Sequence, residues 1–164
     1  MARPLTLVVC GVSGAGKTTI GQLVAARLGC TFLDADDFHP PANVAKMARG
    51  EPLSDADREP WLDVLAREIE QRMAVGQSVV LACSALRKSH RDRLGVDQQR
   101  IVSVFLEGNQ GLVASRIATR AHAFMPTSLL QSQFDVLEAP ADGIRVSIDA
   151  DPATVCERIV DALG

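Results

Sequence analysis

The sequence predicts a three-layer α/β fold in which helices cover both faces of a five-stranded parallel sheet. The first observation is a set of five short apolar runs, rich in β-branched residues, which is typical of strands buried on both faces. The second is helical periodicity between the runs, which turns one apolar stripe of each helix toward the sheet. The runs lie at residues 5–10, 31–33, 78–82, 101–106 and 144–148.

Residues that favour helix ends agree with this alternation. The first predicted helix has an apolar stripe over residues 20–28, and Gly29 follows it as a residue typical of helix ends. Asn109 comes after the fourth strand and can cap the next helix. Asp151 and Pro152 are typical of the cap and first residue of the last helix.

The composition indicates one folded domain over residues 1–164. Hydrophobic residues make up 47% and charged residues 23% of the chain, and no clear strand lies between residues 38 and 77. We expect residues 38–77 to form a helical substrate-binding insertion. The stripe within it that includes Trp61, Leu65 and Ile69 predicts a helix.

Charge and cysteine spacing limit the classes of partner. The net charge is -3 without a basic run, so we expect no nucleic-acid partner. No uncharged apolar stretch reaches about 18 residues, so we expect no membrane span. The four cysteines lack CxxC or CxxH spacing, which favours buried thiols in a reducing cytoplasm.

The segment after the first strand matches the phosphate-binding pattern GxxxxGK[ST], the P-loop, and leads directly into a helix. Its glycines let backbone N–H groups turn toward phosphate oxygens, and the helix dipole adds positive charge. Lys17 is expected to reach the β and γ phosphates and Thr18 to ligate Mg²⁺. The expected nucleotide contacts in this segment are Gly11, Val12, Ser13, Gly14, Ala15, Gly16, Lys17, Thr18 and Thr19.

Two aspartates follow the second strand. Strand alternation would put Asp34 and Asp36 on one side, at the carboxyl end where open α/β sheets bind ligands. One carboxylate could accept a proton from an attacking hydroxyl and the other could hold metal-bound water. Our assignment is Asp36 as the catalytic group and Asp34 with Thr18 at the metal, and the reverse order of the aspartates stays open. The third strand ends in Cys83 without a following aspartate, so no other carboxylate competes there.

Arg116 and Arg120 stand four residues apart and would share one face of a helix. The residues that follow suggest a break, so we expect a mobile lid at residues 117–127. Both guanidinium groups would then lie over the transferring phosphoryl group and neutralise its charge, with Arg120 in a catalytic role. The alternative is a solvated basic helix face.

Together these features resemble the P-loop gluconate kinases, which are relatives of shikimate kinase and the nucleoside monophosphate kinases. The similarity covers nearly the whole chain. Beyond the P-loop it rests on the segments 34–40, 50–53, 57–58, 60–62, 82–86, 124–126 and 132–134. The chain departs from the family pattern at Ala123, where a histidine is usual, and at Arg87, where lysine is common.

The resemblance implies the P-loop kinase fold and transfer of the γ-phosphoryl group of ATP to the 6-hydroxyl of D-gluconate. It also implies Mg²⁺ as cofactor, commonly a homodimer, and adenine contacts near residues 140–143. The implied acceptor contacts are Asp36, His39, Arg58, Ser84, Arg87 and Gln133. Two alternatives remain: a kinase for another small acceptor, such as shikimate or a different sugar acid, and a non-catalytic nucleotide-dependent switch.

Overall fold

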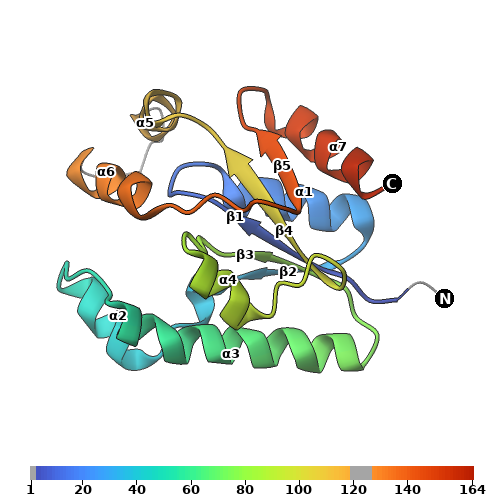
Figure 1. The fold of residues 1–164 in the computed structure, drawn as a ribbon, viewed down its shortest axis with the longest axis horizontal. Helices are drawn as coiled ribbons and strands as arrows, with labels where there is room; N and C mark the ends of the chain where they lie inside the picture. Colours follow the sequence, from blue (N-terminus) through green and yellow to red (C-terminus); the bar gives the residue numbers. More distant parts are fainter. Residues whose placement is uncertain (1–2, 119–126) are drawn as a thin grey trace.

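A five-stranded parallel sheet forms the centre of the protein (Figure 1). The computed structural model describes residues 3–118 and 127–164. Within them the strands run in the order β2-β3-β1-β4-β5. They are β1 (Thr6–Cys10), β2 (Thr31–Asp34), β3 (Val79–Ala82), β4 (Ile101–Glu107) and β5 (Ile144–Ser147). The predicted parallel sheet is confirmed.

Helices follow each strand in sequence. Gly29, Asn109 and Asp151 cap helix ends as expected. The helices are α1 (Lys17–Leu28), α2 (Pro41–Ala48), α3 (Asp55–Ala74), α4 (Lys88–Leu94), α5 (Gln110–Ala118), α6 (Thr127–Val136) and α7 (Pro152–Leu163), with one 3-10 turn, η1 (Ala35–Phe38). Gly29 ends α1 with φ 70°. The side chain of Asn109 accepts the N–H of Leu112 at 2.8 Å, and that of Asp151 accepts the N–H of Thr154 at 2.8 Å.

Alternate residues of β1 enter two different hydrophobic cores, as a strand buried on both faces requires. Leu7 and Val9 pack with α1 and α7, whereas Val8 and Cys10 pack with α3. Helices α1 and α7 therefore cover one face of the sheet and α3 with α4 covers the other (Figure 1). No helix in the described part of the chain is long and apolar enough to cross a membrane.

The segment expected as an insertion, residues 38–77, divides into two parts. α3 buries Trp61, Leu65 and Ile69 in the core beneath β3, so it belongs to the helical layer over that face. α2 lies beside the start of α3 and away from the sheet (Figure 1). Asn43, the buried residue of α2, donates to the carbonyl of Asp57 at 3.0 Å.

Asp57 joins α2 to the first turn of α3. Its carboxylate accepts from Nζ of Lys46 at 2.6 Å and from the N–H of Ser54 at 2.8 Å. Ser54 caps α3 in return by accepting the N–H of Asp57 at 3.1 Å. The hydrogen bond from Lys46, with those from Ser54, lowers the pKa of Asp57 to about 2.

We expect the stabilising effect of Asp57 to disappear in acid. Because its pKa is depressed on folding, the contribution is complete above the ordinary value of 3.8 and is lost as the pH falls toward about 2. Asp57→Asn should therefore unfold more easily than wild type at pH 7, with a difference that shrinks between about pH 4 and pH 2. Urea unfolding at several pH values measures this, with Asp142→Asn as an exposed control. A difference that stays constant with pH would contradict the prediction.

The cysteines are free thiols. Cys10, Cys83 and Cys156 are buried, as expected, and Cys30 is half-buried. Burial raises the pKa of Cys10 to about 11 and that of Cys83 to about 12, despite opposing positive charges. Neither thiol is poised as a nucleophile at neutral pH. Cys83 packs in the hydrophobic core that α3 forms with the sheet.

Candidate active site

The P-loop connects β1 to α1 at the carboxyl end of the sheet, in the context that the motif requires. Gly14 has φ 82° and Gly16 has φ 95°, which other residues rarely adopt. A Cβ atom at Gly14 would lie 2.5 Å from Cγ1 of Ile117, so α5 leaves no room for a side chain there. The first N–H groups of α1 have no partner within the helix and are available to an anion.

Lys17 folds back over the P-loop. Its Nζ donates to the carbonyl oxygens of Gly11 at 3.1 Å and Val12 at 3.0 Å. Burial disfavours the charged ammonium and lowers the pKa of Lys17, while Cys83 and Asp36 oppose this shift. A phosphate oxygen would give the ammonium a charged partner in place of two neutral carbonyls.

Thr18 and Asp34 bring two oxygen atoms together beside the P-loop. The hydroxyl of Thr18, in the first turn of α1, lies 3.4 Å from Oδ2 of Asp34, the last residue of β2. The second carboxylate oxygen of Asp34 accepts the N–H of Asp36 at 3.0 Å, which fixes the side chain. Hydroxyl and carboxylate oxygens are the hard ligands that Mg²⁺ prefers, so this pair fits that ion.

The expected strand alternation of the two aspartates is wrong. β2 ends at Asp34, and η1 begins at the next residue, so Asp36 is placed by a 3-10 turn. The side chain of Asp36 is 85% exposed. Desolvation within the site and the charge of Asp34 nevertheless raise its pKa, against the opposing effect of His39. A raised pKa favours a carboxylate that accepts and releases protons.

His39 lies next to Asp36 and contacts its carboxylate. Its Nε2 lies 3.8 Å from Oδ1 of Asp36, and its ring stacks on Trp61 with centroids 4.2 Å apart. Trp61 is itself fixed, because its Nε1 donates to the carbonyl of Ala35 at 2.8 Å. Burial lowers the pKa of His39, with Asp36 opposing. The His39 side chain is only 4% exposed.

A cavity of about 590 Å³ lies between α3, the loop after β3 and α6. Four of the six expected acceptor residues line it: Arg58, Ser84, Arg87 and Gln133. The other two, Asp36 and His39, are not among its lining residues. The wall also includes residues that were not among the expected acceptor contacts, namely Met47, Leu53, Trp61, Leu86, His90, Ser132 and Val136.

His90 is the polar group of this wall that sequence reasoning missed. Its side chain is 12% exposed, and its Nδ1 accepts the N–H of Arg87 at 3.4 Å. Its Nε2 is buried, makes no hydrogen bond and lies 3.6 Å from Asp55. A lone histidine in a short helix carries no sequence signal, so only the packing of α4 against α3 brought it here.

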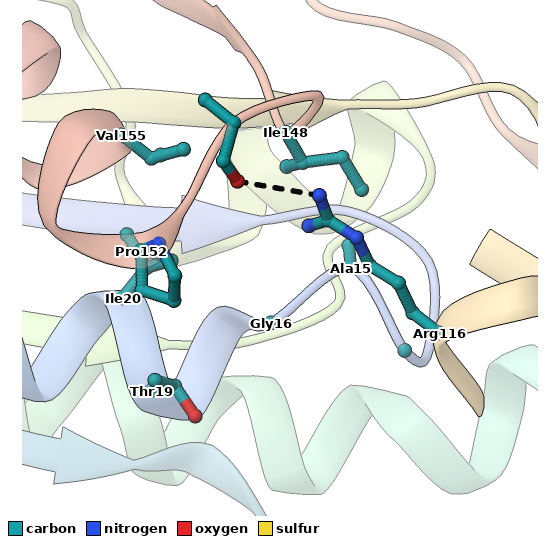
Figure 2. A pocket seen from close by; sticks show the side chains of 10 residues that line it. Ala15, Gly16, Thr19, Ile20, Arg116, Ile148, Pro152 and Val155 are labelled. Carbon is teal, nitrogen blue, oxygen red and sulfur yellow. Dashed lines mark hydrogen bonds between the residues drawn. The ribbon is translucent and has the colours of Figure 1, made fainter. Parts of the chain in front are cut away.

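A second, smaller cavity of about 140 Å³ opens beside the P-loop, as Figure 2 shows. Its wall combines P-loop residues with the segment after β5, namely Gly14, Ala15, Gly16, Thr19, Ile20, Arg116, Ile148, Ala150, Pro152 and Val155. Arg116 reaches over it from α5 and donates to the carbonyl of Ala150 at 3.3 Å. The expected adenine loop at residues 140–143 lies before β5, toward the amino end of that strand, and is not part of this wall.

The expected lid, residues 117–127, falls mostly outside the described part of the chain. Arg120 and Ala123 lie outside the described residues, as do the other residues from 119 to 126. Arg116 lies just before this gap, at the end of α5, and α6 begins directly after it.

A glycine-rich phosphate cradle between a strand and a helix, at the carboxyl end of a parallel sheet, defines the chain as a P-loop kinase. A family model described as "AAA domain" matches residues 7–140. A gluconokinase of Gluconobacter oxydans is 45% identical over 161 residues, with 96% of this chain and 90% of that protein covered. The crystal structure of a gluconokinase from Sinorhizobium meliloti is 38% identical with a TM-score of 0.86, over 99% of this chain and 93% of that one.

The chain belongs to the gluconokinase family. A shikimate kinase from Aquifex aeolicus shares the fold, with a TM-score of 0.61 over 97% of this chain and 96% of that one, but it is only 17% identical. That likeness extends to the fold alone.

Proposed function

We propose that this protein transfers the γ-phosphoryl group of ATP to the 6-hydroxyl of D-gluconate, giving 6-phospho-D-gluconate. The observation that carries the proposal is the cavity of about 590 Å³ between α3, the loop after β3 and α6, where Arg58 and Arg87 accompany the polar side chains of Ser84 and Gln133. Two cations suit a carboxylate, and the hydroxyl and amide suit a chain of hydroxyl groups. The names of the similar proteins support the same acceptor.

The nucleotide would lie across the P-loop, with its phosphates on the N–H groups of residues 11–19 and on Lys17. The cavity beneath Arg116 would take the nucleoside, because an apolar floor from Ile148, Pro152 and Val155 suits a planar base. Arg120 would lie over the phosphates when the lid, proposed at residues 117–127, closes.

Mg²⁺ is the proposed cofactor. Thr18 and Asp34 would hold it directly or through water, with the remaining positions taken by water and phosphate oxygens. When bound, the ion offsets negative charge on the β and γ phosphates.

Asp36 is the proposed catalytic base. The 6-hydroxyl oxygen forms a bond to the γ-phosphorus while the bond from that phosphorus to the bridging oxygen of ADP breaks, and the hydroxyl proton passes to Asp36. His39, whose ring stacks on Trp61, would orient the carboxylate of Asp36. Its effect on the acceptor would therefore be indirect, through Asp36. Arg58, Ser84, Arg87 and Gln133 would hold the rest of gluconate.

We further propose a cytoplasmic homodimer. The dimer rests on the family resemblance, and the compartment rests on four cysteines that are free thiols.

A coupled assay for ADP release tests the function across gluconate, shikimate, other sugar acids, polyols and nucleoside monophosphates. We expect efficient turnover of gluconate alone. Turnover of shikimate without gluconate would replace the proposed acceptor, and tight ATP binding without turnover of any acceptor would favour a nucleotide-dependent switch.

Arg116→Ala tests the nucleoside cavity. The substitution removes the guanidinium of Arg116, which would lie against the adenine base. A contact between a cation and an aromatic ring contributes about 0.5 to 2 kcal/mol. The KM for ATP should rise about tenfold, since tenfold corresponds to about 1.4 kcal/mol, while the KM for gluconate stays near its wild-type value. Arg27→Ala, which removes an exposed arginine paired with Glu157 at 3.1 Å, is the control. A rise in the gluconate KM alone would assign Arg116 to the acceptor.

A further inference from the structure

Gln133 makes a direct contact between α6 and the P-loop across 120 residues of sequence. The N–H of Ser13 donates to Oε1 of Gln133 at 2.7 Å, and Nε2 of Gln133 donates to Oγ of Ser13 at 2.9 Å. The backbone N–H can only donate, so it fixes which end of the amide is oxygen. The orientation of the Gln133 side chain is therefore determined by the P-loop.

The same side chain lines the acceptor cavity. A glutamine amide has two N–H donors and two lone pairs on oxygen. Ser13 uses one donor and one lone pair, which leaves one of each for a ligand in the cavity. A sugar hydroxyl both donates and accepts, so it matches the remaining capacity.

Ser13 is also in a position to respond to the nucleotide. It lies between Val12, whose carbonyl accepts from Lys17, and Gly14, whose backbone is held against Ile117. Phosphate binding that drew Lys17 away from Val12 would change the contacts of the residue next to Ser13. The two hydrogen bonds between Ser13 and Gln133 offer a direct route from that change to the Gln133 amide.

We propose that Gln133 is a positioning residue whose amide binds Ser13 of the P-loop and a hydroxyl of the acceptor at once, so that ATP and the acceptor strengthen each other's binding. This inference rests on the proposed function for the identity of the acceptor. The coupling is reciprocal, because two ligands that share one equilibrium must change each other's affinity by the same factor.

Initial rates measured over a matrix of ATP and gluconate concentrations test the proposal. In the wild type, the KM for gluconate should fall about fivefold or more as ATP rises to saturation, and the KM for ATP should fall as gluconate rises. Gln133→Met keeps the length of the side chain without its polar atoms. In this variant the KM for each substrate should be nearly the same at low and at saturating concentrations of the other substrate. Titration calorimetry of gluconate with and without a non-hydrolysable ATP analogue should give the same change in affinity.

Gln131→Met is the matched control. Gln131 lies on the same helix, and its amide donates to Asp135 at 2.7 Å on an exposed face. In Gln131→Met, the coupling between ATP binding and gluconate binding should equal that of the wild type. Gln133→Glu retains oxygen acceptors for the N–H of Ser13 but loses the donor, so it should keep thermal stability better than Gln133→Met while still losing coupling.

Four outcomes decide the matter. Independent KM values in the wild type, or full coupling in Gln133→Met, would overturn the inference while the proposed function stands. Equal loss of coupling in Gln131→Met would assign the effect to α6 as a whole and would also overturn it. A wild type that turns over no gluconate would overturn the proposed function and this inference with it.

Discussion

Lys17→Ala should lower kcat at least about a hundredfold, because the variant loses the cation that accompanies charge onto the bridging oxygen of ADP. Removal of a single preorganised donor of this kind commonly costs a factor of about 10² to 10³. The fold places the ammonium of Lys17 on the P-loop itself, because its Nζ donates to the carbonyl oxygens of Gly11 and Val12. Steady-state assays with saturating ATP and gluconate give kcat directly.

Two further variants test whether the loss of kcat is specific to the side chain of Lys17. Lys88→Ala removes an exposed lysine that pairs with Asp92 at 2.8 Å, and it should leave kcat unchanged. Lys17→Arg keeps the charge but changes its shape, so it should still be impaired. Near-normal kcat in Lys17→Ala, with normal thermal unfolding, would mean that the phosphoryl group is neutralised by other groups.

Asp36→Asn should lower kcat about 10²- to 10⁴-fold, which is the usual effect of a positioned general base. The amide keeps the size of the side chain but cannot accept the hydroxyl proton. Asp37→Asn, at the neighbouring exposed position in η1, is the matched control and should remain active.

The pH dependence of kcat is a second test of Asp36 as the base. A base acts only when deprotonated, so wild-type kcat should fall as the pH drops through the pKa of Asp36. Desolvation and Asp34 raise that pKa above 3.8, so the fall should begin at a higher pH than for an ordinary aspartate. The residual activity of Asp36→Asn should lack this limb. Near-normal activity in Asp36→Asn would move the base role to Asp34.

Much of the site was predictable because its parts are local in sequence. The P-loop needs only a strand, a glycine-rich turn and a helix in succession, and short-range sterics and hydrogen bonding set that geometry. The strands were equally clear, since apolar runs buried on both faces have few alternatives. Asp34 and Asp36 were found for the same local reason, although the 3-10 turn replaced the expected alternation.

The arrangement of the two cavities was not predictable from local patterns. The smaller cavity includes Ile148 and Pro152 because β5 lies at the edge of the sheet next to β4, which brings the segment after β5 beside the P-loop. His90 lines the larger cavity only through the packing of α4. Such contacts depend on strand order and helix packing, which a single run of residues does not record.

The sequence by itself determined the P-loop, the five parallel strands and, through its family resemblance, the class of acceptor. Only the tertiary structure decided that the amide of Gln133 binds the backbone of Ser13 while lining the cavity between α3, the loop after β3 and α6. The physical reason is that a phosphate cradle is encoded within eight consecutive residues. A contact between the P-loop and α6 requires groups 120 residues apart to meet, and the folded sheet and its helices bring them together.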